Sequence, residues 1–373
     1  MTETKTPRVG FWLPIFGGWL RNVDDEGMPA TFDYCRRVAR RAEELGFSTT
    51  LVAELNLNDI KGPAEPVLEA WSTAAALAAT TERLEIMAAI RPGFRNPAVV
   101  AKMAANIDRI AGGRFTLNVV SAWWAEEARQ YGMDFVEHDE RYARTAEFLA
   151  VLKGLWTQER TTVRGKYVRV EEAYLAPKPV QRPWPRLYAG GESPVAKELI
   201  ARECDAYLMH GDDVETVRGK IADLRRRAAA HGKTLTYGMA AYVICRDSEE
   251  EARAELARIT AVTDAAGYAG FRDFTSMSQL ERELSLRDYS VSNRGLRPNL
   301  VGTPEQIAAR MRAYADAGLD LFLIQCSPML EELERIGQGV LPLLGGQVPA
   351  STPAPPGPTP LAGQADSGFE APA

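Results

Sequence analysis

Polar and aromatic side chains stand directly after several short apolar runs of this sequence. The run at residues 114–120 contains Asn118 and is followed by Ser121, Trp123 and Trp124. If such runs are parallel strands, their carboxyl ends meet at one edge, where ligands of parallel α/β proteins bind. The other residues in comparable positions are Phe16, Trp19, Glu54, Arg91, Phe94, Ser193, His210, Tyr242 and Ser327. We therefore expect a pocket with an aromatic wall and a few polar groups, although both tryptophans would also suit a core.

The turn Gly190-Gly191-Glu192-Ser193-Pro194 is the best candidate for an anion site. Its two glycines let the backbone approach a ligand, Ser193 suits the N-cap of a helix, and Pro194 suits the first turn. Oriented N–H groups at a helix N-terminus bind phosphate. The acidic Glu192 counts against this interpretation, and an ordinary capped turn is the alternative.

A second anion candidate is the helix start His138-Asp139-Glu140-Arg141-Tyr142. Arg141 and Tyr142 can both donate hydrogen bonds to a phosphate. A solvated helix start explains the same residues, so the pattern alone leaves both interpretations open.

Few residues of this chain suggest acid–base or nucleophilic catalysis. His210 is either a proton donor or a hydrogen-bonded structural histidine, and Glu54 is either ion-paired or functional. Arg294 and Arg297 either close over an anionic or polar oxygenated substrate or remain solvated. The sequence shows no Ser/His/Asp elbow, and its three histidines are too scattered to predict a metal site. This pattern favours an enzyme whose chemistry is carried by an organic cofactor.

Eight apolar runs alternate with helical patterns, which predicts an α/β fold of the (β/α)8 barrel type. A doubly wound sheet is the alternative, but the glycine-rich GxGxxG turn expected after its first strand is missing. The expected strands are 8–14, 49–53, 84–90, 114–120, 186–189, 205–209, 236–245 and 320–325.

The expected helices cover residues 31–46, 65–80, 97–111, 140–156, 212–230, 248–259, 304–315 and 328–344, and residues 161–171 alternate like a hairpin. Residues 260–299 resolve into no clear element, so we expect a mobile loop that closes over the ligand. We assign residues 1–345 to the barrel and the Pro- and Ala-rich residues 346–373 to a disordered tail.

Composition limits the possible partners and compartment. The 373 residues carry a net charge of −6, which gives no indication of nucleic acid or an anionic membrane as partner. No apolar run is long enough for a transmembrane helix, and the first residues lack the apolar core of a signal peptide. The four dispersed cysteines favour reduced thiols in the cytoplasm.

Several motifs resemble the bacterial luciferase-like flavin monooxygenases over residues 8–344. The similarity favours the branch that contains the alkanesulfonate, methanesulfonate and dimethyl sulfone monooxygenases and the pyrimidine oxygenase of uracil breakdown. Within it, SVSNRGLRPNLVGTPEQ and QCSPMLEELER are most similar to the dimethyl sulfone enzymes. The motifs are GGRFTLNVVSAWW (Gly112–Trp124), HDERYARTAEF (His138–Phe148), YAGGES (Tyr188–Ser193), VGTPEQIAARM (Val301–Met311) and SPMLEELERIGQGVLPLL (Ser327–Leu344).

The resemblance implies a two-component monooxygenase of sulfur metabolism. Reduced FMN would be its co-substrate, supplied by a separate NAD(P)H:flavin reductase, and O2 its oxidant. It would cleave a C–S bond in a small organosulfur compound; for dimethyl sulfone the products would be methanesulfinate and formaldehyde. The first attack would fall on sulfur, on carbon or on a methyl hydrogen. A homodimer or homotetramer is typical of the family.

The resemblance also suggests roles for individual residues. Asn118 would lie near the isoalloxazine ring and the oxygen site, and His210 and Arg297 are candidate proton donors. Phe16, Trp19, Trp124 and Arg294 would contact the substrate. Positions expected to contact the flavin are Ala53, Glu54, Asn118, Glu127, Arg141, Tyr142, Gly191 and Ser193, with Tyr142 and Ser193 at the phosphate.

Three departures from the alkanesulfonate monooxygenases favour a neutral sulfone over a sulfonate anion. The loop Pro14–Gly18 lacks their histidine, Glu54 and its neighbours replace a cysteine, and Ser327-Pro328-Met329 replaces Tyr-Pro-His. Other substrates with C–S or C–N bonds remain alternatives, as does a deazaflavin-dependent dehydrogenase. A non-enzymatic flavoprotein would be expected to lack some of the barrel units, and a cofactor-free lyase would need a lysine at a strand end.

Overall fold

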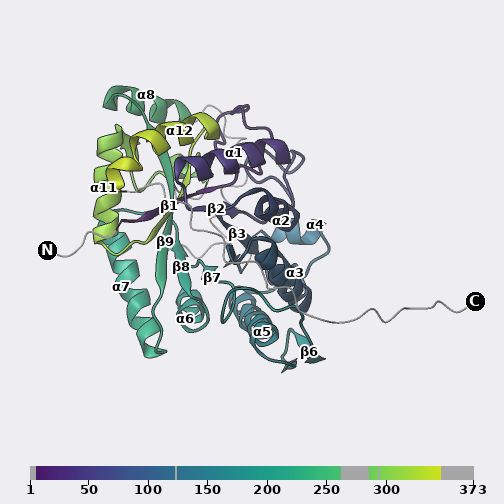
Figure 1. Cartoon of the computed structure of the whole chain (residues 1–373). Coiled ribbons are helices and arrows are strands. Elements are labelled where there is room, and N and C mark those ends of the chain that lie inside the picture. Colours follow the sequence, from purple (N-terminus) through teal and green to yellow (C-terminus); the bar gives the residue numbers. More distant parts are fainter. Residues whose placement is uncertain (1–5, 122–123, 262–284, 293–294, 346–373) are drawn as a thin grey trace, which may run out of the picture.

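The computed structural model describes residues 6–121, 124–261, 285–292 and 295–345. Within them, eight parallel strands close into a barrel with helices on its outside (Figure 1). Going round the barrel, the strands are β1 (Arg8–Trp12), β2 (Thr49–Val52), β3 (Glu85–Ile90), β4 (Phe115–Val119), β7 (Leu187–Ala189), β8 (Ala206–Met209), β9 (Thr236–Cys245) and β11 (Leu321–Gln325).

The barrel closes through β9, which pairs with β8 at residues 236–239 and with β11 at residues 238–242. Because β9 is ten residues long, its last three residues extend beyond the barrel and pair with β10 (Leu300–Gly302), which we did not predict. The predicted fold class and all eight barrel strands are confirmed, with ends that shift by one or two residues.

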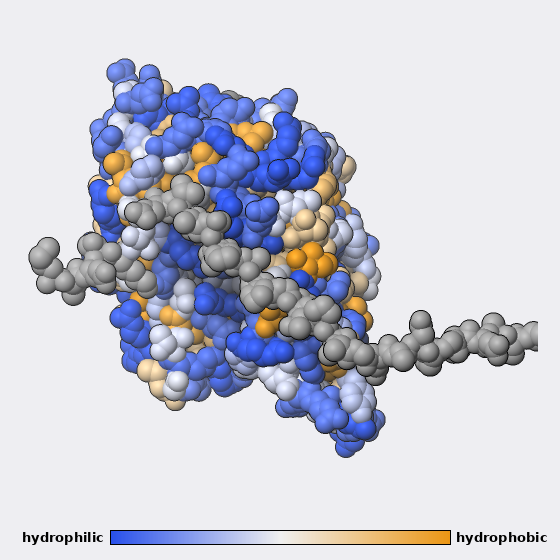
Figure 2. Space-filling model, in the orientation of Figure 1, coloured by the Kyte–Doolittle hydropathy of each residue, from blue (hydrophilic) through white to orange (hydrophobic). Residues whose placement is uncertain are grey.

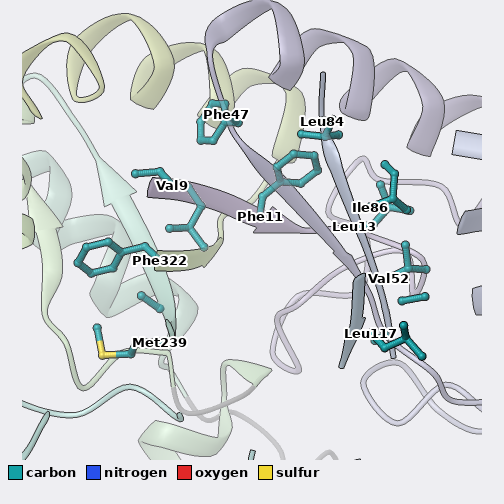
Figure 3. Packing of buried hydrophobic residues seen from close by; sticks show 14 of the residues in the cluster. Val9, Phe11, Leu13, Phe47, Val52, Leu84, Ile86, Leu117, Met239 and Phe322 are labelled. Carbon is teal, nitrogen blue, oxygen red and sulfur yellow. The ribbon is translucent and has the colours of Figure 1, made fainter. Parts of the chain in front are cut away.

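Side chains alternate between the inside of the barrel and the layer beneath the helices. Inside lie Leu51, Met87, Tyr188, Leu208 and Leu321, with Ala206 and Leu323. The outer layer is the larger core, in which the rings of Phe11 and Phe47 meet edge to face, 6.0 Å between centroids (Figure 3). Because both faces of each strand are buried, the strands read as continuous apolar runs rather than as alternating ones.

The amino-terminal end of the barrel is filled by a partly buried polar cluster. Arg8 donates to Glu85 (Nη2 to Oε2, 2.8 Å), and Thr116 donates to the other oxygen of the same carboxylate at 3.1 Å. The Tyr188 hydroxyl lies 3.3 Å from this second oxygen. These hydrogen bonds satisfy the buried groups within the cluster, which closes the end of the barrel opposite to the strand exits.

The principal helices follow the strands and cover the barrel. Polar side chains cap several of them: Thr31 caps α1, Asn96 caps α3, Ser193 caps α6 and Asp213 caps α7. The helices are α1 (Phe32–Leu45), α2 (Ala70–Thr80), α3 (Pro97–Ile110), α5 (His138–Thr157), α6 (Pro194–Glu203), α7 (Val214–Ala230), α8 (Glu249–Ile259), α11 (Pro304–Asp316) and α12 (Met329–Gly339).

Shorter elements decorate this frame. The predicted hairpin is present as β5 (Thr161–Arg164) and β6 (Arg169–Ala173), outside the barrel next to α5. Between β4 and α5, where no element was predicted, the chain forms the short helix α4 (Ala125–Gln130), and it also forms α10 (Leu286–Tyr289) and a 3-10 turn at Pro342–Leu344. The helix expected over 65–80 begins only at Ala70, because Glu69 caps it with hydrogen bonds to the N–H groups of Trp71 and Ser72.

The loop predicted at 260–299 is described only in part. Its returning end joins the loop after β1: Leu20 and Val291 form an antiparallel bridge, and Ser292 N–H donates to Trp19 O at 3.1 Å. Residues 262–284, 293–294 and the tail 346–373 lie outside the described residues, so the closing motion and the disorder stay predictions.

The face shown in Figure 2 is mostly hydrophilic, and its apolar side chains form small separate patches. In the described part of the chain, none of the helices has the length and apolar character needed to cross a membrane.

Candidate functional site at the carboxyl ends of the strands

The turn after β7 has the close backbone approach that its glycines suggested. A Cβ on Gly191 would lie 2.6 Å from the Cβ of Ala196 and 3.0 Å from the Tyr142 hydroxyl oxygen. Ser193 caps α6, and its hydroxyl accepts from Ala196 N–H at 3.3 Å. The turn therefore has no room for a side chain at position 191, directly before a helix N-terminus.

The two anion candidates from the sequence lie against each other. The hydroxyl of Tyr142, the fifth residue of α5, is hydrogen-bonded to Ser193. Burial raises the pKa of Tyr142 above its ordinary value, although this hydrogen bond opposes the shift. The ring of Tyr142 lies 5.1 Å from that of His138. Tyr142, Gly191 and Ser193 thus form one polar corner from two elements about fifty residues apart.

Beside this corner, a small pocket opens between α5 and the exits of β3 and β4. Arg141 lines it, donating from Nη1 to Val136 O at 2.9 Å, with its guanidinium 4.6 Å from the Phe135 ring centroid. The Nε of Arg141 is buried and has no hydrogen-bond partner among the residues that the structure describes. Burial lowers the pKa of Arg141. The remaining lining residues are Pro92, Gly93, Phe94, Ser121, Asp134, Arg144 and Thr145.

A buried ion cluster ties together the exits of β2, β3 and β4. Arg91 forms a bidentate pair with Glu127, and its backbone N–H donates to Glu54 Oε2 at 2.7 Å. Glu127 also accepts from Asn56 N–H at 2.5 Å, and Arg95 donates to Glu54 Oε1 at 2.6 Å. Burial raises the pKa of the Glu54 carboxyl, although Arg95 and Arg91 both lower it. The structure thus places Glu54 and Glu127 in ion pairs.

Asn118 lies on β4 between the registers of Ala89 and Tyr188. Since Leu117 and Val119 point into the outer layer, Asn118 points inside the barrel, at the carboxyl end. It is 7% exposed, and its Oδ1 has no hydrogen-bond partner among the described residues. A buried oxygen without a partner is rare enough to indicate a ligand position.

The predicted aromatic wall is mostly buried. Phe16 and Trp19 meet edge to face at 6.4 Å, and the buried Nε1 of Trp19 has no hydrogen-bond partner in the described structure. Ala53 follows β2 and is buried, whereas Trp124 is half-buried just before α4. Trp123 and Arg294 lie outside the described residues.

The two candidate proton donors occupy different surroundings. His210 directly follows β8 and is half-buried. Arg297 lies 3.2 Å from Asp288 (Nη2 to Oδ2) and 3.9 Å from Asp212 (Nη1 to Oδ2). Arg297 is therefore engaged by two carboxylates.

Sequence reasoning missed three polar contacts at this end of the barrel. These are the Arg91–Glu127 pair, a Lys220–Glu192 pair, and the hydrogen bonds between Gln325 and Ser292. Lys220 carried a usable signal, because it shares a helix face with apolar neighbours at i−3, i+1 and i+4, and a charge on such a stripe needs a partner. The other contacts carried no comparable signal.

The candidate site is thus the carboxyl end of a (β/α)8 barrel, with a polar corner, a buried unpaired amide oxygen and an aromatic side. Among the described residues, His, Cys, Asp and Glu side chains form no group of three that could hold a metal ion.

Comparisons with known proteins agree with this architecture. A family model described as luciferase-like monooxygenase matches residues 10–321. The FMNH2-dependent dimethylsulfone monooxygenase of Pseudomonas putida is 38% identical over 346 residues, covering 90% of this chain and 95% of the relative. The enzyme of the same description from Pseudomonas fluorescens (strain Pf0-1) is 36% identical, covering 90% and 94%. The crystal structure of a long-chain alkane monooxygenase superposes with a TM-score of 0.78 at 20% identity, covering 92% of both chains.

The chain belongs to the luciferase-like monooxygenase family. The family predicted from the motifs is therefore confirmed.

Proposed function

We propose that this protein is a monooxygenase that uses reduced FMN and O2 to oxidise dimethyl sulfone to methanesulfinate and formaldehyde. The observation that carries the proposal is the similarity, over nine-tenths of the chain, to two relatives described as FMNH2-dependent dimethylsulfone monooxygenases. In the overall reaction, the sulfone, O2 and two reducing equivalents give methanesulfinic acid, formaldehyde and water.

The residues present fit an FMN cofactor. The turn at Gly191 and Ser193 and the Tyr142 hydroxyl would form a cradle of N–H and O–H donors for the phosphate, and a Cβ at position 191 would displace this turn because it would lie 2.6 Å from that of Ala196. The unpartnered Nε of Arg141 is a further donor beside this cradle, and the unpartnered Oδ1 of Asn118 is an acceptor for the N–H groups of an isoalloxazine ring. When bound, reduced FMN supplies the electrons that activate O2.

The protein's own residues would bind, orient and exclude water. Arg91, Glu54 and Glu127 would act at a distance, by holding the loops that border the pocket. Phe16 and Trp19 would supply an apolar side against the sulfone methyl groups, and His210 remains our candidate proton donor at the strand exits. An apolar side of this kind suits the methyl groups of a sulfone, which carries no net charge.

The partners and compartment follow from the same proposal. A separate NAD(P)H:flavin reductase would supply the reduced FMN, and the enzyme would be a homodimer or homotetramer. The four free cysteines, all buried, support a reducing compartment such as the cytoplasm. Analytical ultracentrifugation tests the oligomer, and a monomer at micromolar concentration would refute that part.

A single-turnover experiment tests the function. The protein is mixed anaerobically with photoreduced FMN and dimethyl sulfone, O2 is admitted, and formaldehyde and methanesulfinate are quantified. We expect both products in a one-to-one ratio and in proportion to enzyme. Flavin oxidation without product would reject dimethyl sulfone and direct the search to sulfonates, whereas failure to bind reduced FMN would reject the flavin proposal.

A further inference from the structure

The polar corner contains a carboxylate that should oppose a phosphate. Glu192 lies between Gly191 and Ser193 in the turn after β7 and is 7% exposed. A nearby negative charge raises the cost of binding a phosphate, which carries one to two negative charges near neutral pH. The turn therefore needs a compensating cation if phosphate is to bind there.

Lys220 supplies this cation from α7. Its Nζ lies 3.0 Å from Glu192 Oε1, and the two side chains are 6% and 4% exposed. Lys220 stands on the buried face of α7, among Val217, Ile221 and Leu224. A lysine in such a place is retained only when it is paired, because burying an isolated charge is costly.

The pair belongs to a longer line of charges. Lys220 Nζ lies 3.7 Å from Asp212 Oδ2, and Asp212 lies 3.9 Å from Arg297, which in turn contacts Asp288. The backbone of Asp212 is fixed as well, since its carbonyl accepts from the Tyr314 hydroxyl at 2.7 Å. This line connects the turn after β7 with the loop after β8 and with the described end of the 260–299 segment.

We propose that Lys220 is a positioning residue for phosphate recognition: it neutralises Glu192 and holds the turn so that its N–H groups face the phosphate of the flavin. This inference rests on the proposed function, since it assumes that FMN binds at the Ser193 turn. Glu192 then serves as the point at which α7 holds the turn. The neutral Lys220–Glu192 pair is compatible with a bound phosphate dianion, whereas an unpaired Glu192 carboxylate is not.

Comparison of FMN with riboflavin, which lacks the phosphate, separates this role from general stabilisation. Dissociation constants are measured anaerobically for both reduced flavins from the quenching of tryptophan fluorescence. The proteins are the wild type, Lys220→Met, Glu192→Gln and the double variant, and circular dichroism confirms that each is folded. The matched control is Lys153→Met, which removes the partner of Glu203 (2.9 Å) in a half-buried pair between α5 and α6.

Lys220→Met should raise the dissociation constant of reduced FMN about tenfold or more and should change that of reduced riboflavin by less than about twofold. Glu192→Gln should leave FMN binding unchanged or tighten it, because the amide oxygen can still accept a hydrogen bond from Lys220 and hold the turn while the opposing charge is removed. The double variant should return to within about threefold of the wild type, since neither charge remains. Lys153→Met should leave the ratio of the two constants unchanged.

An FMN-to-riboflavin ratio that is the same in all five proteins would overturn the proposal, provided that the wild type prefers FMN. If Lys220→Met loses affinity equally for both flavins, the ion pair has only a stabilising role, and the proposal is also overturned. If Lys220→Met does not fold, Glu192→Gln still decides, because weaker FMN binding in that variant contradicts the charge argument. A wild type that binds neither flavin would refute the proposed function itself.

Discussion

Replacement of Arg91 by methionine tests whether ion pairs hold the strand exits together. The Arg91 and Glu127 side chains are 3% and 0% exposed, and Glu54 is 4% exposed. Methionine fills a similar volume, so the substitution removes charge with little change in packing. It leaves two carboxylates buried next to each other, and only Glu54 keeps a cation, Arg95.

Removal of one partner from a buried ion pair costs about 3–5 kcal/mol of unfolding free energy, because the remaining charge is uncompensated. Addition of Glu127→Gln to Arg91→Met should recover about 1–3 kcal/mol, since the amide oxygen can still accept from Asn56 N–H. Urea denaturation followed by tryptophan fluorescence measures both values.

The control is Arg129→Met, which lies on the same helix as Glu127, α4. Its partner Glu126 lies 2.5 Å away, but the side chains are 71% and 49% exposed, so the urea midpoint should not move. If Arg91→Met loses less than about 1 kcal/mol, or if the double variant is no more stable than the single one, the assignment of a structural role to this cluster is wrong.

Three further outcomes follow from the site. Gly191→Ala should weaken reduced FMN about tenfold or more, because its Cβ would lie 2.6 Å from that of Ala196, whereas Gly219→Ala, with nothing within 4 Å, should bind normally in the same fluorescence titration. Asn118→Leu should abolish product formation in the single-turnover assay. The urea midpoint should stay within experimental error of the wild type, because the substitution deletes a buried oxygen that has no partner in the described structure. Full product formation by this variant would contradict a ligand-binding role for Asn118. Burial raises the pKa of the Cys204 thiol to about 12 and that of the Cys245 thiol to about 11. At pH 8 the native protein should therefore react with a thiol reagent at least about a hundredfold more slowly than the unfolded protein. The reaction of the native protein should accelerate as the pH rises towards these pKa values.

The fold was predictable because its signals are local. Each barrel strand is buried on both faces and therefore appears as an apolar run, and most of the principal helices begin at a residue whose side chain caps them. The errors lie where hydrophobic periodicity carries no information. The start of α2 is set by hydrogen bonds from Trp71 and Ser72 N–H to the Glu69 side chain, and β10 forms only because β9 extends beyond the barrel.

The candidate site was predictable only in part, for a related reason. Strand ends gave the positions of Asn118 and Ser193, and the motif at His138–Phe148 gave Tyr142, which the structure brings beside Ser193. The sequence could not show that Glu54 and Glu127 both face Arg91, since these residues lie 37 and 36 positions away from it along the chain. It also could not show that Arg297 faces two carboxylates.

Two separate groups of buried charges border the same end of the barrel. One joins the exits of β2, β3 and β4 through Arg91, and the other joins those of β7 and β8 through Lys220. Loops at these exits cannot pack like helices, because their backbone must stay open to a ligand, and short-range ion pairs with fixed geometry hold them instead. Buried pairs add little net stability but are costly to break, so they favour a single arrangement of the loops. Removal of the cation from either group, Arg91 or Lys220, should therefore change ligand binding through the loop geometry even where no substituted atom touches the ligand.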